Sequence, residues 1–181
     1  MKRRTIIGVS IFLLLGIIIY LCSPKWYLVH PKTTIKSSYR KELANLGTKA
    51  IISLDVPVGA ILVYKDSIIG RGFNTVRRYH IAGGHAEINA ISDAINKLGW
   101  DGFRLLDHSE LIMYSTFEPC PMCIGAMEEY HIKHAVFIKS KPATQWFGTD
   151  LRHLRYEWFK RKSSEDNLQD SLFRAYPGYR E

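Results

Sequence analysis

Apolar positions recur with a helical and then a strand period along the first part of the folded region. At 39–51 they are spaced by three and four residues, which predicts one apolar face of a helix that Ser38 can cap. Two runs with the composition of β-strands follow, at 57–64 and 67–73. Because only the polar residues 65–66 separate these runs, they predict a β-hairpin.

The pattern then predicts alternating helices and strands. Residues 74–84 contain glycines and basic residues without a period, which predicts a loop. A helix, a buried strand, a helix opened by prolines and a last strand are predicted at 85–98, 111–116, 119–130 and 134–138. The order α-β-β-α-β-α-β is typical of a layered α/β domain. After residue 140, aromatic and basic residues alternate and predict further helix.

A nearly unbroken apolar run at 6–21 precedes these elements. With Thr5 and Cys22 it reaches about 18 residues, which at about 1.5 Å per residue nearly matches a hydrocarbon layer of about 30 Å. The basic residues at 2–4 are equally typical of a secretory signal peptide. Bulky residues stand where signal peptidase needs small ones, so we predict an uncleaved, single-pass transmembrane helix.

Basic residues flank the apolar run on both sides, so the positive-inside rule is nearly tied. Large domains cross membranes largely regardless of charge, which favours an exported catalytic domain and membrane contact through residues 5–22. We therefore predict an anchor or signal peptide at 1–22, a linker at 23–36 and one domain at 37–181. A chain of 181 residues with 46% hydrophobic content suits a single core.

Charge and cysteine content exclude little. The net charge of +8 is compatible with polyanionic partners and equally with a basic surface near anionic lipids. Three cysteines do not make a disulfide framework, because one lies in the apolar run and two form a close pair.

Two short motifs carry the candidate chemistry: His85-Ala86-Glu87 and the later Glu-Pro-Cys-Pro-Met-Cys at 118–123. Zinc prefers nitrogen and sulfur ligands, and three protein ligands with an open fourth position are typical of catalytic sites. We predict one Zn²⁺ ion held by His85, Cys120 and Cys123. Glu87 is close enough along the helix to take a proton from the metal-bound water and pass it on, so we predict that it is catalytic.

Each motif alone has a simpler interpretation. A Cys-x-x-Cys pair is often half of a structural zinc site or a redox pair, and His-x-Glu occurs by chance in many chains. Together, His-x-Glu followed by Pro-Cys-x-x-Cys is the pattern of the zinc-dependent nucleobase deaminases. The combination therefore favours a hydrolytic enzyme acting on a carbon–nitrogen bond.

Four stretches resemble the tRNA adenosine deaminase and guanine deaminase branch of the cytidine deaminase-like superfamily, at 56–60, 72–74, 85–87 and 118–127. The resemblance implies a three-layer α/β/α, CMP/dCMP-type deaminase domain with a mixed five-stranded sheet and one catalytic zinc. It also allows a homodimer.

The same resemblance implies that Asn74 hydrogen-bonds the base and that Ala86 and Val58 line the pocket. Asn74 is also a common residue type in turns, so closing the hairpin is an alternative role. The chain departs from the family at 81–84, where Ile-Ala-Gly-Gly replaces the common Asp-Pro-Thr-Ala, and again at 141–146. Because both segments flank the expected pocket, the resemblance does not identify the substrate.

The predicted reaction is hydrolytic deamination of a nucleobase or nucleoside, in which zinc-bound hydroxide attacks the amine-bearing ring carbon and ammonia leaves. We favour a small-molecule substrate, because an exported domain would meet little tRNA. Three alternatives stay open: a tRNA adenosine-to-inosine deaminase, an enzyme for a lipid-proximal or modified nucleotide, and a catalytically silent, membrane-anchored module that binds zinc or nucleotides.

Overall fold

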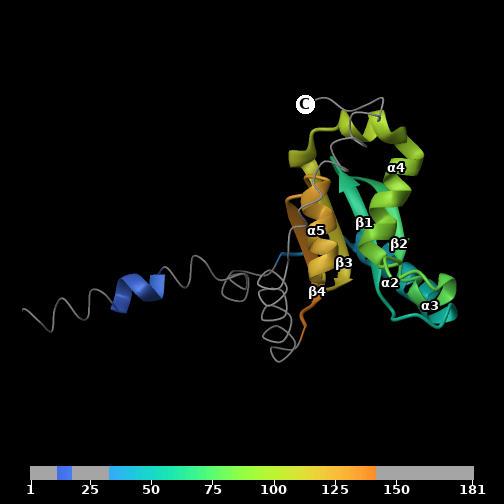
Figure 1. The fold of residues 1–181 in the computed structure, drawn as a ribbon, viewed down its shortest axis with the longest axis horizontal. Helices are drawn as coiled ribbons and strands as arrows, with labels where there is room; N and C mark the ends of the chain where they lie inside the picture. The colour runs from blue at the N-terminus through green and yellow to red at the C-terminus, as the bar shows by residue number, and fades with distance from the viewer. Residues whose placement is uncertain (1–11, 18–32, 142–181) are drawn as a thin grey trace, which may run out of the picture. The chain divides into compact units, whose positions relative to one another are not determined.

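The computed structural model describes residues 12–17 and 33–141 (Figure 1). The chain divides into two compact units, Met1–Lys41 and Glu42–Glu181. In the described part of the first unit, residues 12–17 are helical, and helix α2, Ser37–Ile52, begins. Most of the predicted linker and the whole predicted C-terminal helical region lie outside the described residues.

The prediction of a transmembrane helix is wrong for the part of the chain that the structure describes. There, no helix combines the length and the apolar character that a membrane span requires. A membrane span needs about 20 apolar residues in one continuous helix, because the bilayer core is about 30 Å thick and a helix rises about 1.5 Å per residue. The apolar character of the run reports only the free energy of transferring its side chains from water into a membrane, and it does not by itself show a continuous helix. Three predictions depended on that helix and are wrong with it: the single-pass membrane location, the membrane contact and the exported catalytic domain. Residues 5–11 and 18–22 of the apolar run lie outside the described residues.

The second unit contains one mixed β-sheet in the strand order β2-β1-β3-β4. β1 is antiparallel to both of its neighbours, and β4 is parallel to β3. The α/β class is as predicted, but the expected five-stranded sheet is wrong, because the described residues form four strands. The fifth strand came from the family resemblance, whereas the hydrophobic pattern itself predicts four. Their bounds are Gly59–Tyr64, Ser67–Phe73, Leu111–Phe117 and His134–Lys139.

β1 and β2 form the predicted hairpin. Lys65 and Asp66 connect them and have φ angles of 44° and 66°. Two consecutive residues with positive φ give a turn whose twist matches that of the two strands. The register shifts once, between Leu62 and Val63.

Within the described residues, three α-helices follow the hairpin: α3, α4 and α5, at Val76–Tyr79, Ala86–Arg104 and Pro121–Glu129. α3 lies within the predicted loop, because four residues are too few to show a helical period. α4 extends beyond the predicted end at residue 98. At Gly99 the backbone leaves the helical region, with φ 73° and ψ 160°, so α4 consists of two helical segments joined at a kink, and the second ends at Arg104. Such a conformation suits glycine and ends the apolar period there.

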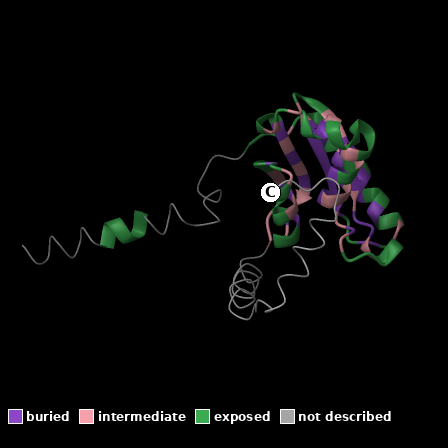
Figure 2. Ribbon diagram, turned by 45° about the horizontal axis from the view of Figure 1, so that its top comes forward, coloured by how far each residue is buried: buried purple, intermediate pink, exposed green. Residues whose placement is uncertain are grey.

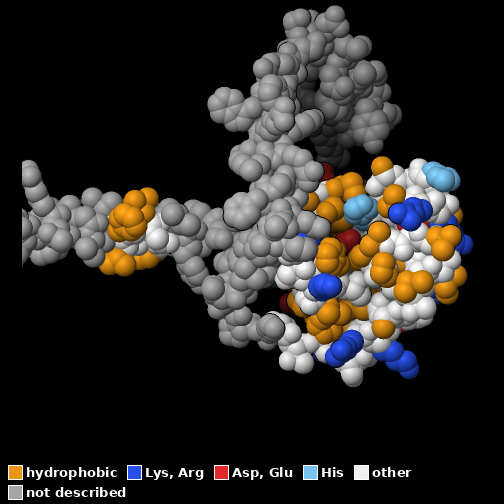
Figure 3. Space-filling view, turned by 90° about the horizontal axis from the view of Figure 1, so that it is seen from below, with side chains coloured by type: hydrophobic (Ala, Val, Ile, Leu, Met, Phe, Trp, Pro, Cys, Tyr) orange, Lys and Arg blue, Asp and Glu red, His pale blue; other side chains and the backbone are white. Residues whose placement is uncertain are grey.

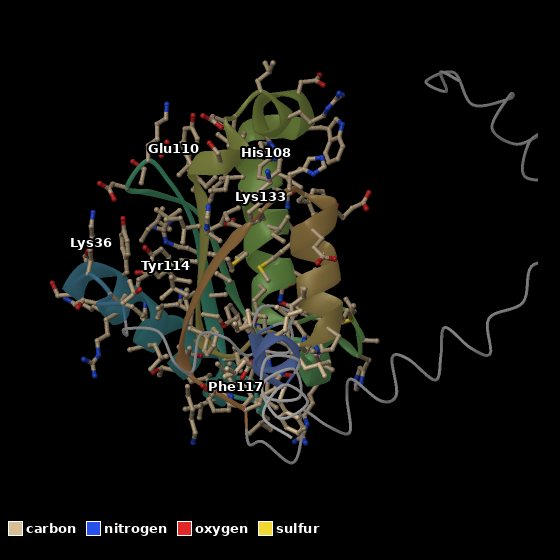
Figure 4. All side chains as sticks on the ribbon, turned by 90° about the vertical axis from the view of Figure 1, so that its left-hand side faces the viewer. Lys36, His108, Glu110, Tyr114, Phe117 and Lys133 are labelled. Carbon is tan, nitrogen blue, oxygen red and sulfur yellow. The ribbon has the colours of Figure 1, made fainter. Side chains whose placement is uncertain are left out.

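Helices cover both faces of the sheet: α4 and α5 lie on one face, and the part of α2 from Glu42 onward lies on the other (Figure 4). The buried residues gather between these layers (Figure 2). The largest cluster joins the sheet to α4 and α5, and its central members are Ala60, Leu62, Ala90, Ile91, Phe103 and Met113.

Gly72 lets β2 approach the start of α4 without a side chain between them. A Cβ atom there would lie 2.1 Å from the carbonyl oxygen of Ala86 and 2.4 Å from the backbone nitrogen of Ala90. Both clashing atoms belong to backbone, so they cannot rotate away. We expect Gly72→Ala to lower the free energy of unfolding by about 3 kcal/mol in urea titrations. Gly83→Ala is the matched control, because nothing lies within 4 Å of its added Cβ; equal effects of both would contradict the tight approach.

Candidate functional site

The sheet topology brings the carboxyl ends of β2, β3 and β4 to one end of the sheet, which is called the carboxyl edge below. β2 and β3 are both antiparallel to β1, so they run in the same direction, and β4 is parallel to β3. α4 follows β2 and α5 follows β3, so both helices begin at this edge. Phe117, the last residue of β3, marks it in Figure 4, with Glu110 at the opposite end. Ligand sites of α/β proteins form at the carboxyl ends of parallel strands.

The three predicted metal ligands lie at the starts of the two helices. His85 and Cys120 occupy the N-cap positions of α4 and α5, in extended backbone conformation. Pro121 follows at the first helical position, which its fixed φ favours. Cys123 lies on the first turn of α5. The structure therefore brings together the two motifs that are separated in the sequence, and it places their side chains in one group.

The geometry of this group fits zinc. The His85 Nδ1 and the two sulfur atoms are each 3.5 Å from the other two. A tetrahedral zinc ion with ligands at about 2.0–2.3 Å requires ligand atoms about 3.6–3.8 Å apart. Both cysteines are free thiols, and one imidazole with two sulfurs is a common zinc donor set. The group thus fits one zinc ion with three protein ligands and one open position.

The two cysteines differ in acidity. The two cysteine sulfur atoms are 3.5 Å apart and share a hydrogen bond, which lowers the pKa of Cys120 to about 5. The same hydrogen bond raises the pKa of Cys123, and burial and the Glu87 carboxylate raise it further. Cys120 therefore carries the thiolate at neutral pH, which is the form that binds metals.

Glu87 lies beside the metal-ligand group and is almost completely buried, with 4% of its surface exposed. Its Oε2 is 3.4 Å from the Cys123 sulfur, and its Oε1 accepts a hydrogen bond from the Ser115 hydroxyl at 3.1 Å. A carboxylate in the first turn of α4 is also favoured by the helix dipole. One oxygen is thus held by the sheet, while the other faces the metal ligands.

Sequence reasoning missed Ser115. It is fully buried in β3, where most neighbours are apolar, and its hydroxyl contacts Glu87 across 28 residues of sequence. A serine inside an otherwise apolar strand was the available signal. Buried polar side chains need a hydrogen-bond partner, but the sequence does not say which one.

A cavity of about 310 Å³ opens beside this group. Its volume is at the low end for small-molecule sites, which suits a single base. Of the predicted substrate contacts, Val58 and Asn74 line it together with His85, Glu87 and Cys120. Ala86 is fully buried in the core cluster and does not line this cavity.

Asn74 has a defined orientation. Its Oδ1 accepts a hydrogen bond from the backbone nitrogen of Ala86 at 2.9 Å, and its own backbone nitrogen donates to the carbonyl oxygen of Val58. Asn74 therefore joins the end of β2 to the start of α4. Its Nδ2 has no hydrogen-bond partner within the described part of the chain, although the residue is only 7% exposed.

Comparisons with known proteins agree with this geometry. Residues 34–139 match the family described as the cytidine and deoxycytidylate deaminase zinc-binding region. The tRNA-specific adenosine deaminase of Bacillus subtilis is 34% identical over 125 residues, which cover 69% of this chain and 74% of that protein. The enzyme of the same description from Buchnera aphidicola subsp. Schizaphis graminum is 40% identical over 83 residues, which cover 46% of this chain and 52% of that one. The chain thus spans only about half of the Buchnera protein.

Solved structures share the fold. A tRNA:A34 deaminase matches with a TM-score of 0.52 and 28% identity, over 59% of this chain and 78% of that one. The guanine deaminase of Bacillus subtilis matches with a TM-score of 0.61 over 82% of this chain and 99% of that one, but at 24% identity it supports the fold alone. From the match over residues 34–139 and from the zinc-ligand group, we conclude that the chain belongs to the cytidine and deoxycytidylate deaminase family of zinc-binding proteins.

Proposed function

We propose that the protein is a zinc-dependent hydrolytic deaminase of a nucleobase, either free, in a nucleoside or within RNA. The observation that carries this proposal is the placement of Glu87. A buried carboxylate lies beside a three-ligand metal group in a cavity of about 310 Å³. A structural zinc site would be closed by a fourth side chain and would need no such carboxylate.

In this proposal, His85, Cys120 and Cys123 are the metal ligands. The zinc ion would supply Lewis acidity that makes a water molecule nucleophilic near neutral pH. Glu87 takes a proton from the attacking water and delivers it to the ring nitrogen. It then takes the second proton of that water from the new hydroxyl group on the ring carbon and delivers it to the amine, which leaves as ammonia. The Ser115 hydrogen bond holds one oxygen of Glu87, so the other oxygen performs these transfers.

Two further residues are proposed to hold the base. Because Ala86 holds the Oδ1 atom of Asn74, the Nδ2 atom is left to donate to an acceptor atom on the substrate. Val58 is 8% exposed and offers an apolar wall for the flat face of the ring.

Two substrate classes remain: a free base or nucleoside, and adenosine within tRNA. The preference for the small molecule has lost its main support. That preference rested on an exported domain, which the structure does not uphold. Similarity to the Bacillus subtilis tRNA-specific adenosine deaminase now favours adenosine in tRNA at least as strongly. The cavity holds one base in either case, because a base in RNA must leave its stack to react.

Release of ammonia by the purified full chain tests the proposal. The zinc-loaded protein is incubated with adenine, guanine, cytosine, their nucleosides and a tRNA anticodon stem-loop, and ammonia is measured by a coupled assay. We expect turnover on at least one member of this panel. If zinc is bound and no substrate releases ammonia, the protein is a silent zinc- or nucleotide-binding module and the proposal is wrong.

Ser115 provides a test of how Glu87 is positioned. Ser115→Ala removes the hydrogen bond to Oε1 of Glu87 and leaves a buried carboxylate oxygen unpaired. We expect kcat to fall about tenfold at unchanged zinc content. Ser115→Thr keeps the hydroxyl and should restore most of the activity. The control is Ser109→Ala, which removes an exposed hydroxyl before the opposite end of β3. A loss of zinc in Ser115→Ala would mean that Ser115 supports the fold rather than Glu87.

A further inference from the structure

The cavity beside Glu87 has a buried end and an exposed mouth. Glu87 and Asn74 line its buried end, with 4% and 7% of their surfaces exposed. Val56 and Arg77 line the same cavity, but both side chains are exposed. A base whose reacting carbon lies near Glu87 must therefore extend its substituents toward Val56 and Arg77.

Arg77 brings a positive charge to this mouth without a charged partner. Within residues 12–17 and 33–141, its guanidinium group makes no ion pair. Asp55 is the nearby acid, but its two oxygens accept the backbone N–H groups of Arg77 and Arg78 at 2.8 and 3.2 Å. Asp55 thus holds the backbone of α3 in place, and no described residue pairs with the Arg77 guanidinium group.

Lys141, the other basic residue of this cavity, is already engaged. Its Nζ donates to the carbonyl oxygen of Pro119 at 2.9 Å. Lys and Arg side chains are more prominent than acidic ones on the visible described surface at this edge of the sheet (Figure 3). Asp55 and Glu118 also line the cavity, but their oxygens accept backbone N–H groups of α3 and of Lys141. Among the described residues, the Arg77 guanidinium group is therefore the cation of this cavity that has no side-chain or backbone acceptor.

We propose that Arg77 binds a phosphate group attached to the sugar of the substrate. A guanidinium group presents paired N–H donors that match two phosphate oxygens, and such charge-assisted hydrogen bonds are strong. A free base carries no phosphate group that Arg77 could bind while its reacting carbon lies near Glu87. The preferred substrate is then a phosphorylated nucleoside, either a mononucleotide or a nucleotide within RNA. This inference rests on the proposed deaminase function and names its substrate class more closely.

The test compares each nucleoside with its phosphorylated form. In the full chain, kcat/KM is measured for adenosine, cytidine and guanosine, their 5′-monophosphates and an RNA anticodon stem-loop. We expect Arg77→Ala to lower kcat/KM about tenfold or more for phosphorylated substrates and to leave the nucleosides unchanged. Loss on mononucleotides identifies a terminal phosphate, whereas loss on the stem-loop alone identifies the RNA backbone.

Arg78→Ala is the matched control. The Arg78 guanidinium group lies 5.3 Å from the centre of the Tyr79 ring and does not line the cavity. It should leave every substrate unchanged, while Arg77→Lys should keep part of the preference. An equal effect of Arg77→Ala on nucleosides and nucleotides, or no effect, overturns the inference and leaves the proposed function standing.

Binding of the deaminated products provides a readout without turnover. Calorimetry with inosine and inosine 5′-monophosphate should show weaker binding of the monophosphate alone in Arg77→Ala. If the wild-type chain deaminates no substrate, the proposed function fails, and this measurement still decides whether Arg77 recognises phosphate. Equal affinities of both proteins for the monophosphate would contradict that role.

Discussion

Replacing Glu87 by Gln is expected to reduce kcat by about 10²–10⁴-fold, the range that a positioned acid or base contributes. The amide keeps the size of the carboxylate and can still contact Ser115, but it cannot take up and release a proton near neutral pH. The variant should therefore still bind substrate. Turnover is measured by ammonia release on the best substrate of the wild-type chain, and metal content by elemental analysis.

Two outcomes would contradict the role of Glu87. Unchanged turnover would show that another group moves the protons, and loss of zinc would show that Glu87 supports the metal site instead. Glu110→Gln is the matched control, because it makes the same chemical change at an exposed position at the opposite end of β3 (Figure 4). We expect that control to retain full activity.

The second large effect is expected from the metal ligands. Cys120→Ser should lower the zinc content from one ion per chain to nearly none, because a serine hydroxyl does not ionise near neutral pH to replace the thiolate. Activity should disappear with the metal. The melting temperature should fall as well, since zinc that binds only the folded state stabilises it.

Cys22→Ser serves as the control, because it makes the same chemical change at the one cysteine of the chain that lies outside both motifs. It should retain zinc, activity and melting temperature. A strong chelator should reproduce the effect of Cys120→Ser in the wild-type chain, and added zinc should reverse it. Full zinc occupancy in Cys120→Ser would contradict the assignment of this cysteine as a ligand.

The local elements were predictable because their determinants lie within a few residues of one another. The apolar spacing predicted α2 and the first part of α4, and the two polar residues between strands predicted the hairpin turn. α3 and the continuation of α4 past Gly99 were not predicted. A four-residue helix has no measurable period, and the short helical segment after the kink at Gly99 does not continue the apolar pattern before it.

Two predictions failed: the transmembrane helix, inferred from an apolar run, and the fifth strand, inferred from a family resemblance. The apolar run at the N-terminus met a length criterion for a membrane span, but no helix of the described residues is long and apolar enough to be one. The fifth strand came from family resemblance, and the described residues form a sheet of four strands. The local hydrophobic pattern did not determine either feature: an apolar run does not by itself establish a membrane-spanning helix, and the pattern of the chain predicted four strands rather than five.

The sequence by itself determined the chemical inventory: one imidazole, two thiols and one carboxylate at two predicted helix starts, which together indicated a zinc-dependent deaminase. Only the tertiary structure decided how these groups meet, since the directions of β2 and β3 relative to β1 bring both helix starts to one edge. It also decided that Ser115 holds Glu87 and that Arg77 lines the same cavity as Glu87. Motifs depend on neighbours along the chain, whereas such contacts depend on strand pairing between distant residues, which no local pattern encodes.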